Sequence, residues 1–229
     1  MYARLLASVC LLSVGAVAAP SERAIEGGKT IAVYSRHSAT VPAAVSEAMR
    51  RETEALMESG GFRVQWLEEP HEVTAAFLVV VDLKGSCDPL PDAAIPPATQ
   101  RLASTFVEDG RILPFITVDC VAVQQFLALA LKGKRSPNPQ FLYGRALARL
   151  LSHELYHVLV QTADHTGAGV TRAAVSAREL VSDRFTFPEE ALSKLHATVS
   201  VPPTSKVEAD AGAELDFRVL QARAPRLAR

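Results

Sequence analysis

The sequence has almost no excess of charge of either sign. Its 24 lysine and arginine residues are balanced by 25 aspartate and glutamate residues, which leaves a formal net charge of −1. Such a chain offers neither the basic surface that nucleic acids require nor a polybasic patch for membrane lipids. Apolar residues make up 48% and charged residues 21% of the 229 residues. We therefore expect a globular protein with one sizeable core and no nucleic-acid partner.

Long apolar runs are scarce as well. One run, Leu5–Val17, is too short to cross a bilayer comfortably, and no second run of about 18 apolar residues follows it. The run comes after Arg4 and ends in the small-x-small sequence Ala16–Ala18, which is typical of a secretory signal peptide. We therefore expect residues 1–18 to be a signal peptide and the protein to be exported, to the periplasm or the extracellular space. The alternative is an uncleaved anchor or a buried N-terminal helix.

Cysteine is equally rare, with three residues in the chain. Cys10 lies within the expected signal peptide, so that Cys87 and Cys120 remain in the mature protein. An even pair in an exported chain favours a disulfide, because the compartments outside the cytosol are oxidising. Closing a loop of that length stabilises a fold by roughly 3–4 kcal/mol in the chain-entropy model. Two buried free thiols are the competing interpretation.

Apolar periodicity in the first half of the chain predicts a sheet backed by a helix. Three β-rich runs occur, the last of them continuously apolar as in a central strand: Thr30–Ser35, Phe62–Leu67 and Ala75–Asp82. Between the first two, Val41–Ser59 has apolar residues at helical spacing and is followed by Gly60–Gly61 as a stop signal. Thr40 or Ser38 is suited to cap its start. This order predicts an α+β fold with a small twisted sheet and a helix on one face.

A hairpin is predicted next. The runs Ser104–Glu108 and Arg111–Val118 flank the dipeptide Asp109–Gly110, a strong signal for a tight β-turn. Pro114 removes one hydrogen-bond donor from the second run, so we expect that strand at the edge of the sheet. An edge strand there is able to pair with an additional extended peptide segment.

Helical patterns dominate the second half. Val121–Leu131 is the first, and a longer amphipathic helix begins at Asn138–Pro139, with Asn as N-cap and Pro at the first helical position. Two further helices are expected over Ala173–Asp183 and Glu189–Ala197. We therefore expect one domain over residues 27–197. Residues 198–229 are rich in Pro, Ala and charge, which predicts a loosely ordered tail.

The motif HELYH, residues 153–157, lies on the long amphipathic helix. Around that helix His157 projects about 40° and Glu154 about 100° from His153, so the three side chains share one sector. Two imidazoles one turn apart can bind one Zn²⁺, which lowers the pKa of a water molecule to about 7. Glu154 is placed to take the proton of that water and pass it to the leaving amine. The competing interpretation is a helix surface with two solvated histidines.

A catalytic zinc needs a third protein ligand. His165 is favoured, because the glycines and polar residues around it indicate that the helix has ended and the chain has turned back. Glu179, on a following helix, is the alternative third ligand. Asp164 and Asp183 are candidates for orienting a ligand histidine, since such a histidine donates its second N–H to a carboxylate or a carbonyl.

The region around HELYH resembles the zincin metallopeptidases. A helical HExxH followed by a nearby loop histidine is similar to the metzincins, whose pattern is HExxHxxGxxH. Here Val160 stands at the glycine position, Ala163 at the third histidine position, and no methionine follows the motif. By contrast, Glu179, Ser182 and Asp183 have the spacing Glu-x-x-Ser-Asp, which resembles the pattern of the thermolysin-like gluzincins. The chain is also similar, over Phe141–Phe187, to a group of secreted bacterial proteins with HELYH and a late histidine, which implies a minimal zincin.

The function expected from sequence is a secreted zinc-dependent metallopeptidase. Glu154 acts as the general base, His153, His157 and His165 hold Zn²⁺, and the partner is a peptide or protein substrate. The resemblance leaves two alternatives open. One is an exported zinc-binding protein without catalytic activity, an interaction module on a zincin scaffold. The other is a zinc hydrolase acting on a non-peptide amide.

Overall fold

The computed structural model describes residues 29–37, 40–68, 75–89, 101–132 and 138–198. The expected signal peptide, residues 1–18, and nearly all of the expected tail lie outside these ranges. Both therefore stay predictions. Within the described part of the chain, no helix is both long and apolar enough to cross a membrane.

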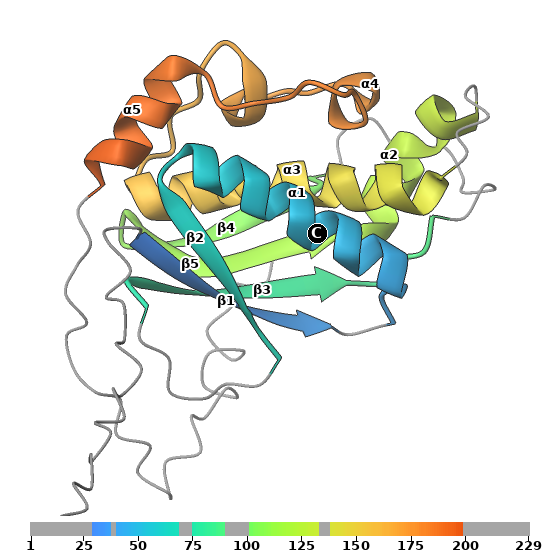
Figure 1. Ribbon diagram of the computed structural model, residues 1–229, viewed down its shortest axis with the longest axis horizontal. Helices are drawn as coiled ribbons and strands as arrows, with labels where there is room; N and C mark the ends of the chain where they lie inside the picture. The colour runs from blue at the N-terminus through green and yellow to red at the C-terminus, as the bar shows by residue number, and fades with distance from the viewer. Residues whose placement is uncertain (1–28, 38–39, 69–74, 90–100, 133–137, 199–229) are drawn as a thin grey trace, which may run out of the picture.

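A five-stranded mixed sheet forms one layer of the fold (Figure 1). The strand order is β2-β1-β3-β5-β4, with bounds β1 Lys29–His37, β2 Phe62–Leu67, β3 Phe77–Lys84, β4 Ala103–Glu108 and β5 Arg111–Asp119. All neighbouring pairs are parallel except β4 and β5, which form an antiparallel hairpin. The expected central strand is confirmed, since the apolar β3 has two strands on each side. The hairpin turn is confirmed too, because Asp109 and Gly110 both have positive φ, as a primed turn requires.

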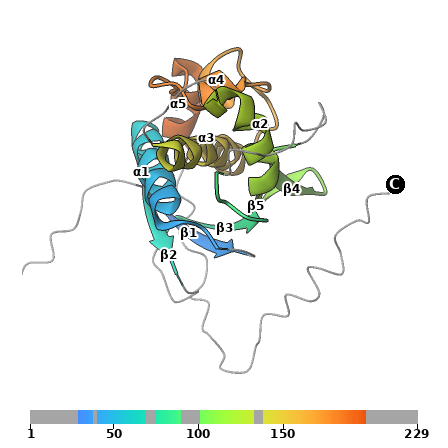
Figure 2. The same ribbon diagram turned by 90° about the vertical axis from the view of Figure 1, so that its right-hand side faces the viewer.

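Two long helices, α1 Ala43–Ser59 and α3 Pro139–Val160, lie side by side on one face of the sheet (Figures 1 and 2). They approach closely at Gly144, where a Cβ atom would lie 2.5 Å from the carbonyl oxygen of Val45. The core lies between this layer and the sheet, and includes Ile31, Val33, Val79, Val81, Leu147 and Leu151, all fully buried. The helices α2 Cys120–Lys132, α4 Ala177–Leu180 and α5 Glu189–Ala197, with the 3-10 turn η1 Gly169–Thr171, complete the described fold. The α+β class is therefore confirmed.

The expected edge position of the Pro114 strand is wrong. β5 lies between β3 and β4, and β4 is the outermost described strand on that side. Proline is tolerated because pairing with β3 begins only at Phe115. On the other side the register shifts, so that Leu113 pairs with Phe106 and Ile116 with Thr105. Pro114 therefore lies at a bulge, where no ladder bond needs its missing N–H.

Two helix ends differ from expectation. α1 begins after Pro42, whose carbonyl accepts from two backbone N–H groups, and no side chain caps it. The cap expected from Thr40 is therefore wrong, and Ser38 lies outside the described residues. The helix expected over Ala173–Asp183 shrinks to the single turn α4. The carbonyls of Glu179 and Leu180 at its end accept hydrogen bonds from Arg149 of α3, and the carbonyl of Ser182 just after it accepts from Arg145.

The expected disulfide is confirmed. Cys87 and Cys120 are bonded, with Cα atoms 4.9 Å apart and a separation of 33 positions in sequence. Cys87 follows the end of β3 and Cys120 opens α2, so that the bond links the central strand to the helix beside the site. Both residues are fully buried.

Candidate metal centre

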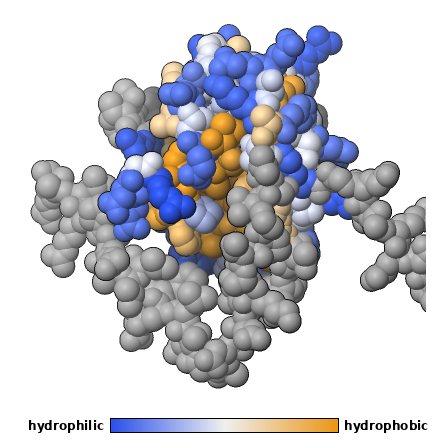
Figure 3. Space-filling view, turned by 90° about the vertical axis from the view of Figure 1, so that its left-hand side faces the viewer, coloured by the Kyte–Doolittle hydropathy of each residue, from blue (hydrophilic) through white to orange (hydrophobic). Residues whose placement is uncertain are grey.

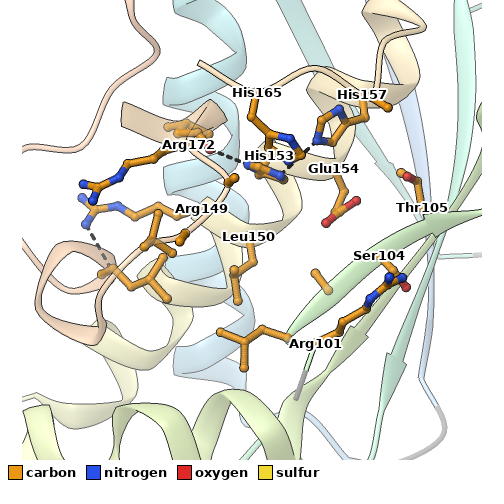
Figure 4. Close-up of a pocket in the computed structure, with 18 of the residues that line it drawn as sticks. Arg101, Ser104, Thr105, Arg149, Leu150, His153, Glu154, His157, His165 and Arg172 are labelled. Atoms are coloured by element: carbon orange, nitrogen blue, oxygen red, sulfur yellow. Dashed lines mark hydrogen bonds between the residues drawn. The ribbon is translucent and has the colours of Figure 1, made fainter. Parts of the chain in front are cut away.

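α3 is the element that positions the HELYH motif. Its start is as predicted, since the Asn138 side chain accepts from the N–H of Phe141 at 2.9 Å. The helix then continues through the motif. The rings of His153 and His157 point toward one another and toward His165, while Glu154 extends beside them toward Thr105 on β4 (Figure 4). The single sector predicted from helical spacing is therefore present.

The chain turns back directly after α3. Gln161 adopts the left-handed conformation, with φ of 55°, and its side-chain amide donates to the carbonyls of Ile112 and Val158. Farther along, the backbone N–H of Thr166 donates to the carbonyl of Thr171 at 3.0 Å. This closed loop carries His165 back over the helix (Figure 4).

Three imidazole rings meet at this point. The ring centroid of His165 lies 5.1 Å from that of His153 and 4.8 Å from that of His157. One ring nitrogen from each residue lies within 4.8 Å of the other two. His157 is buried, His153 is half-buried and His165 is exposed, so the group opens to solvent on one side. These three histidines form a group that could hold a metal ion.

Backbone carbonyls orient the two helical histidines. Nδ1 of His153 lies 2.7 Å from the carbonyl oxygen of Val170, and Nδ1 of His157 lies 2.6 Å from that of Thr162. A carbonyl can only accept, so each Nδ1 carries a proton and each neutral ring keeps its Nε2 lone pair. The two Nε2 atoms face one another at 3.0 Å. Two lone pairs at that distance repel unless a cation lies against both.

This spacing passes a simple test of fit for a metal. Nitrogens about 2.0–2.1 Å from a tetrahedral ion are separated by about 3.3 Å, close to the Nε2 separation of 3.0 Å. Burial lowers the pKa of His153 to about 4 and also lowers that of His157. Both rings are therefore neutral at pH 7 and free to ligate.

Glu154 is the one carboxylate of the centre. It is 7% exposed and points toward β4, near Thr105 (Figure 4). Burial raises its pKa to about 7, although hydrogen bonding from Thr105 and the charge of Arg101 act in the opposite direction. A carboxyl group that titrates near neutral pH is suited to accept and return a proton.

Glu179, the alternative third ligand, has other partners. Its carboxylate accepts from the backbone N–H and the hydroxyl of Ser176, both at 2.7 Å, and from Arg172 at 2.7 Å. These bonds lower its pKa, the backbone bond from Ser176 having the largest effect. Glu179 thus forms a capping box at the start of α4. Metal ligation by His165 stays a prediction, supported by this geometry.

Neither aspartate orients a histidine as expected. Asp183 is almost fully exposed and pairs with Arg145 at 3.0 Å. For Asp164, the recorded hydrogen bond runs from its backbone N–H to the Thr162 hydroxyl. The backbone carbonyls of Val170 and Thr162 orient the histidines instead, so the role expected of Asp164 and Asp183 is wrong. Sequence could not reveal this, because every residue carries a carbonyl.

A cavity of about 710 Å³ opens in front of the centre. Its walls come from α3, the loop after α3, β4 and α2 (Figure 4). Apolar side chains line its depth, among them Leu150 and Phe126, while Ser104 and Thr105 of β4 border the side near Glu154. The contribution of β4 was not expected, because Pro114 predicted that the following strand lies at the edge of the sheet.

No protein-family model matches this sequence, and no curated protein matches it.

Proposed function

We propose that the protein is a secreted zinc-dependent metallopeptidase. The observation that carries the proposal is the convergence of three imidazoles beside a buried Glu154. The Nε2 atoms of His153 and His157 lie 3.0 Å apart, and a ring nitrogen of His165 lies within 4.8 Å of them. The disulfide and the sequence pattern of residues 1–18 support export.

Zinc is the metal that suits this donor set best. Three neutral imidazoles without a thiolate favour zinc or another late first-row metal, whereas Ca²⁺ and Mg²⁺ prefer oxygen donors. Three protein ligands also leave one position open, as in catalytic zinc sites. Zinc at this position supplies a Lewis acid that polarises a carbonyl and makes water acidic enough to react near neutral pH.

Glu154 performs the proton transfers in this proposal. Its carboxylate takes a proton from the attacking water and gives it to the nitrogen of the departing amine. Burial suits the group for both steps, because its pKa of about 7 lets it hold and release a proton at neutral pH. A site that only stored metal would gain nothing from burying this charge, which favours an enzyme over a non-catalytic zinc-binding module.

The outer strand offers a place for an extended substrate. β4 is the outermost described strand beside the cavity, and in this proposal an extended substrate pairs with its outer side. Val107 lines the cavity and, like Phe106, is an exposed apolar side chain on this strand. Apolar side chains gather on the face of the molecule that Figure 3 shows, which is the left-hand side of Figure 1. A peptide lying along β4 would contact both the strand and the apolar cavity.

The test compares the mature protein with Glu154→Gln. We expect one zinc per chain in both, by metal analysis, and cleavage of a mixed peptide library by the native protein alone. Glu58→Gln is the matched control, since Glu58 is exposed on α1 away from the cavity. Zinc bound in both without peptide cleavage in either would favour the non-catalytic module. Equal cleavage by both would refute the role of Glu154.

A further inference from the structure

Most of the charged side chains that line the cavity beside the histidines are positive. Among the described lining residues there are three arginines, Arg101, Arg149 and Arg172, and a single carboxylate, Glu154. Arginine is thus the commonest charged residue at this cavity, although the chain as a whole is nearly neutral. Such a cleft attracts anionic ligands.

Two of these arginines are already paired. Arg149 lies 2.9 Å from Glu52 and also donates to the carbonyls of Glu179 and Leu180. Arg172 lies 2.7 Å from the carboxylate of Glu179. Their guanidinium groups lie on the side of the cavity away from Glu154 (Figure 4). Neither is available to a ligand without giving up an existing partner.

Arg101 differs from both. Within the described part of the chain, no hydrogen bond or ion pair is recorded for its side chain, which is exposed. It lies just before β4, and its guanidinium extends toward Ser104, on the same side of the cavity as Glu154 (Figure 4). A guanidinium with unused donors at the border of a substrate channel is suited to bind a carboxylate through two parallel hydrogen bonds.

We propose that Arg101 binds a carboxylate of the substrate, so that the site prefers peptides with a negative charge next to the bond that is cleaved. This inference rests on the proposed function and specifies its substrate class. The carboxylate comes from an acidic side chain or from the C-terminus of the peptide. In the first case the protein is an endopeptidase with acidic preference, and in the second it removes C-terminal residues.

The experiment uses matched quenched decapeptides and the zinc-loaded mature chain. One arm compares peptides that differ only by Glu, Gln or Lys at each position in turn, and the other compares free and amidated C-termini. Both kcat/KM and, in the Glu154→Gln background, binding by fluorescence anisotropy are measured. The proteins are native, Arg101→Gln, Arg101→Glu and the control Arg63→Gln, an exposed arginine on the opposite edge strand β2.

We expect the native protein and Arg63→Gln to favour the carboxylate member of one arm by about tenfold to 100-fold, the range of a charge-assisted hydrogen bond. Arg101→Gln should remove this preference, and Arg101→Glu should shift it toward the lysine peptide. The arm that responds identifies the source of the carboxylate.

Equal cleavage and equal binding of the members in both arms would overturn the inference, as would a preference retained by Arg101→Glu. Failure of the proposed function looks different, because no peptide is then cleaved although zinc is bound. In that case the binding measurement still decides the role of Arg101. If the Glu peptide binds more tightly than the Gln peptide, and this difference is lost in Arg101→Gln, the role of Arg101 is supported. If there is no such difference in affinity, or if none of the peptides binds, the role of Arg101 is rejected.

Discussion

Arg149 on α3 lies 2.9 Å from Glu52 on α1, and its side chain is only 1% exposed. Arg149 is one turn before His153 on the same helix, and it also donates to carbonyls at the end of α4. One buried cation therefore joins α1, α3 and the α4 segment beside the metal centre. Burial acts to lower the pKa of this guanidinium and the charge of Glu52 acts to raise it, as expected for a buried cation that depends on its partner.

Removing one partner of this pair should cost more than removing both. Glu52→Gln leaves a buried charge without its counter-ion, and we expect a loss of about 3–5 kcal/mol in the free energy of unfolding. The double variant Glu52→Gln, Arg149→Met should lose less than Glu52→Gln alone. Urea unfolding of the metal-free protein measures both. Glu68→Gln, which breaks an exposed pair with Arg50, should cost less than about 1 kcal/mol. A loss for Glu52→Gln as small as that of this control would contradict the expectation.

Much of the fold could be predicted because the decisive signals are local. The continuous apolar run of β3, the Asn138 cap and the Asp109–Gly110 turn each depend on a few neighbouring residues, and each was predicted correctly. The position of Pro114 was not, since a proline is also tolerated where a bulge leaves its nitrogen without a partner. Whether Pro114 marks an edge strand or a bulge depends on pairing with strands that are distant in sequence.

In the candidate site, too, the features set by neighbouring residues could be predicted and those set by the rest of the fold could not. Helical spacing alone places His153, Glu154 and His157 together, whereas the fold supplies what surrounds them. The carbonyls of Thr162 and Val170 that fix the ring tautomers have no sequence signature. The shortening of the helix around α4 also escaped prediction, because it depends on arginines of α3 that reach its carbonyls.

His165 should contribute far more to zinc affinity than Glu179. His165→Ala removes a ring from the group of three, and we expect a loss larger than the roughly 10–100-fold that follows when an orienting partner is removed. Glu179→Ala breaks the Ser176 capping box and the Arg172 pair but leaves all three rings in place, so its affinity should stay closer to native. Competition with a chelator measures both. A greater loss in Glu179→Ala would assign the third ligand to the glutamate instead.

Glu154 should lower the stability of the metal-free protein at neutral and alkaline pH. Its pKa is about 7 in the folded state, against an ordinary value of 4.5, so the folded state binds more protons between these values. The free energy of unfolding therefore falls as pH rises through this window. Glu154→Gln lacks this titration and should be more stable by on the order of 3 kcal/mol above pH 7. The difference should vanish near pH 4. Denaturant unfolding with chelator present, across pH 4–8.5, tests this, and a constant difference would contradict it.

The last prediction concerns the loop that orients His153. Gly169 has φ of +63°, and a Cβ atom there would collide with the carbonyl oxygen of Thr186 and lie 3.2 Å from Pro188. The next residue, Val170, accepts from His153 and donates its own N–H to the same Thr186 carbonyl. A side chain at Gly169 must therefore displace the carbonyl that fixes the ring of His153.

Gly169→Ala should consequently weaken both the fold and the metal site. We expect a loss of about 1–3 kcal/mol in the free energy of unfolding, from the strained backbone and the collision. Zinc affinity should fall about 10–100-fold, because an orienting partner of a ligand histidine is lost. Gly167→Ala is the matched control, since a Cβ atom at Gly167 meets nothing within 4 Å and no positive φ is involved. If Gly169→Ala is destabilised while its zinc affinity stays equal to that of Gly167→Ala, the Val170 carbonyl does not control His153.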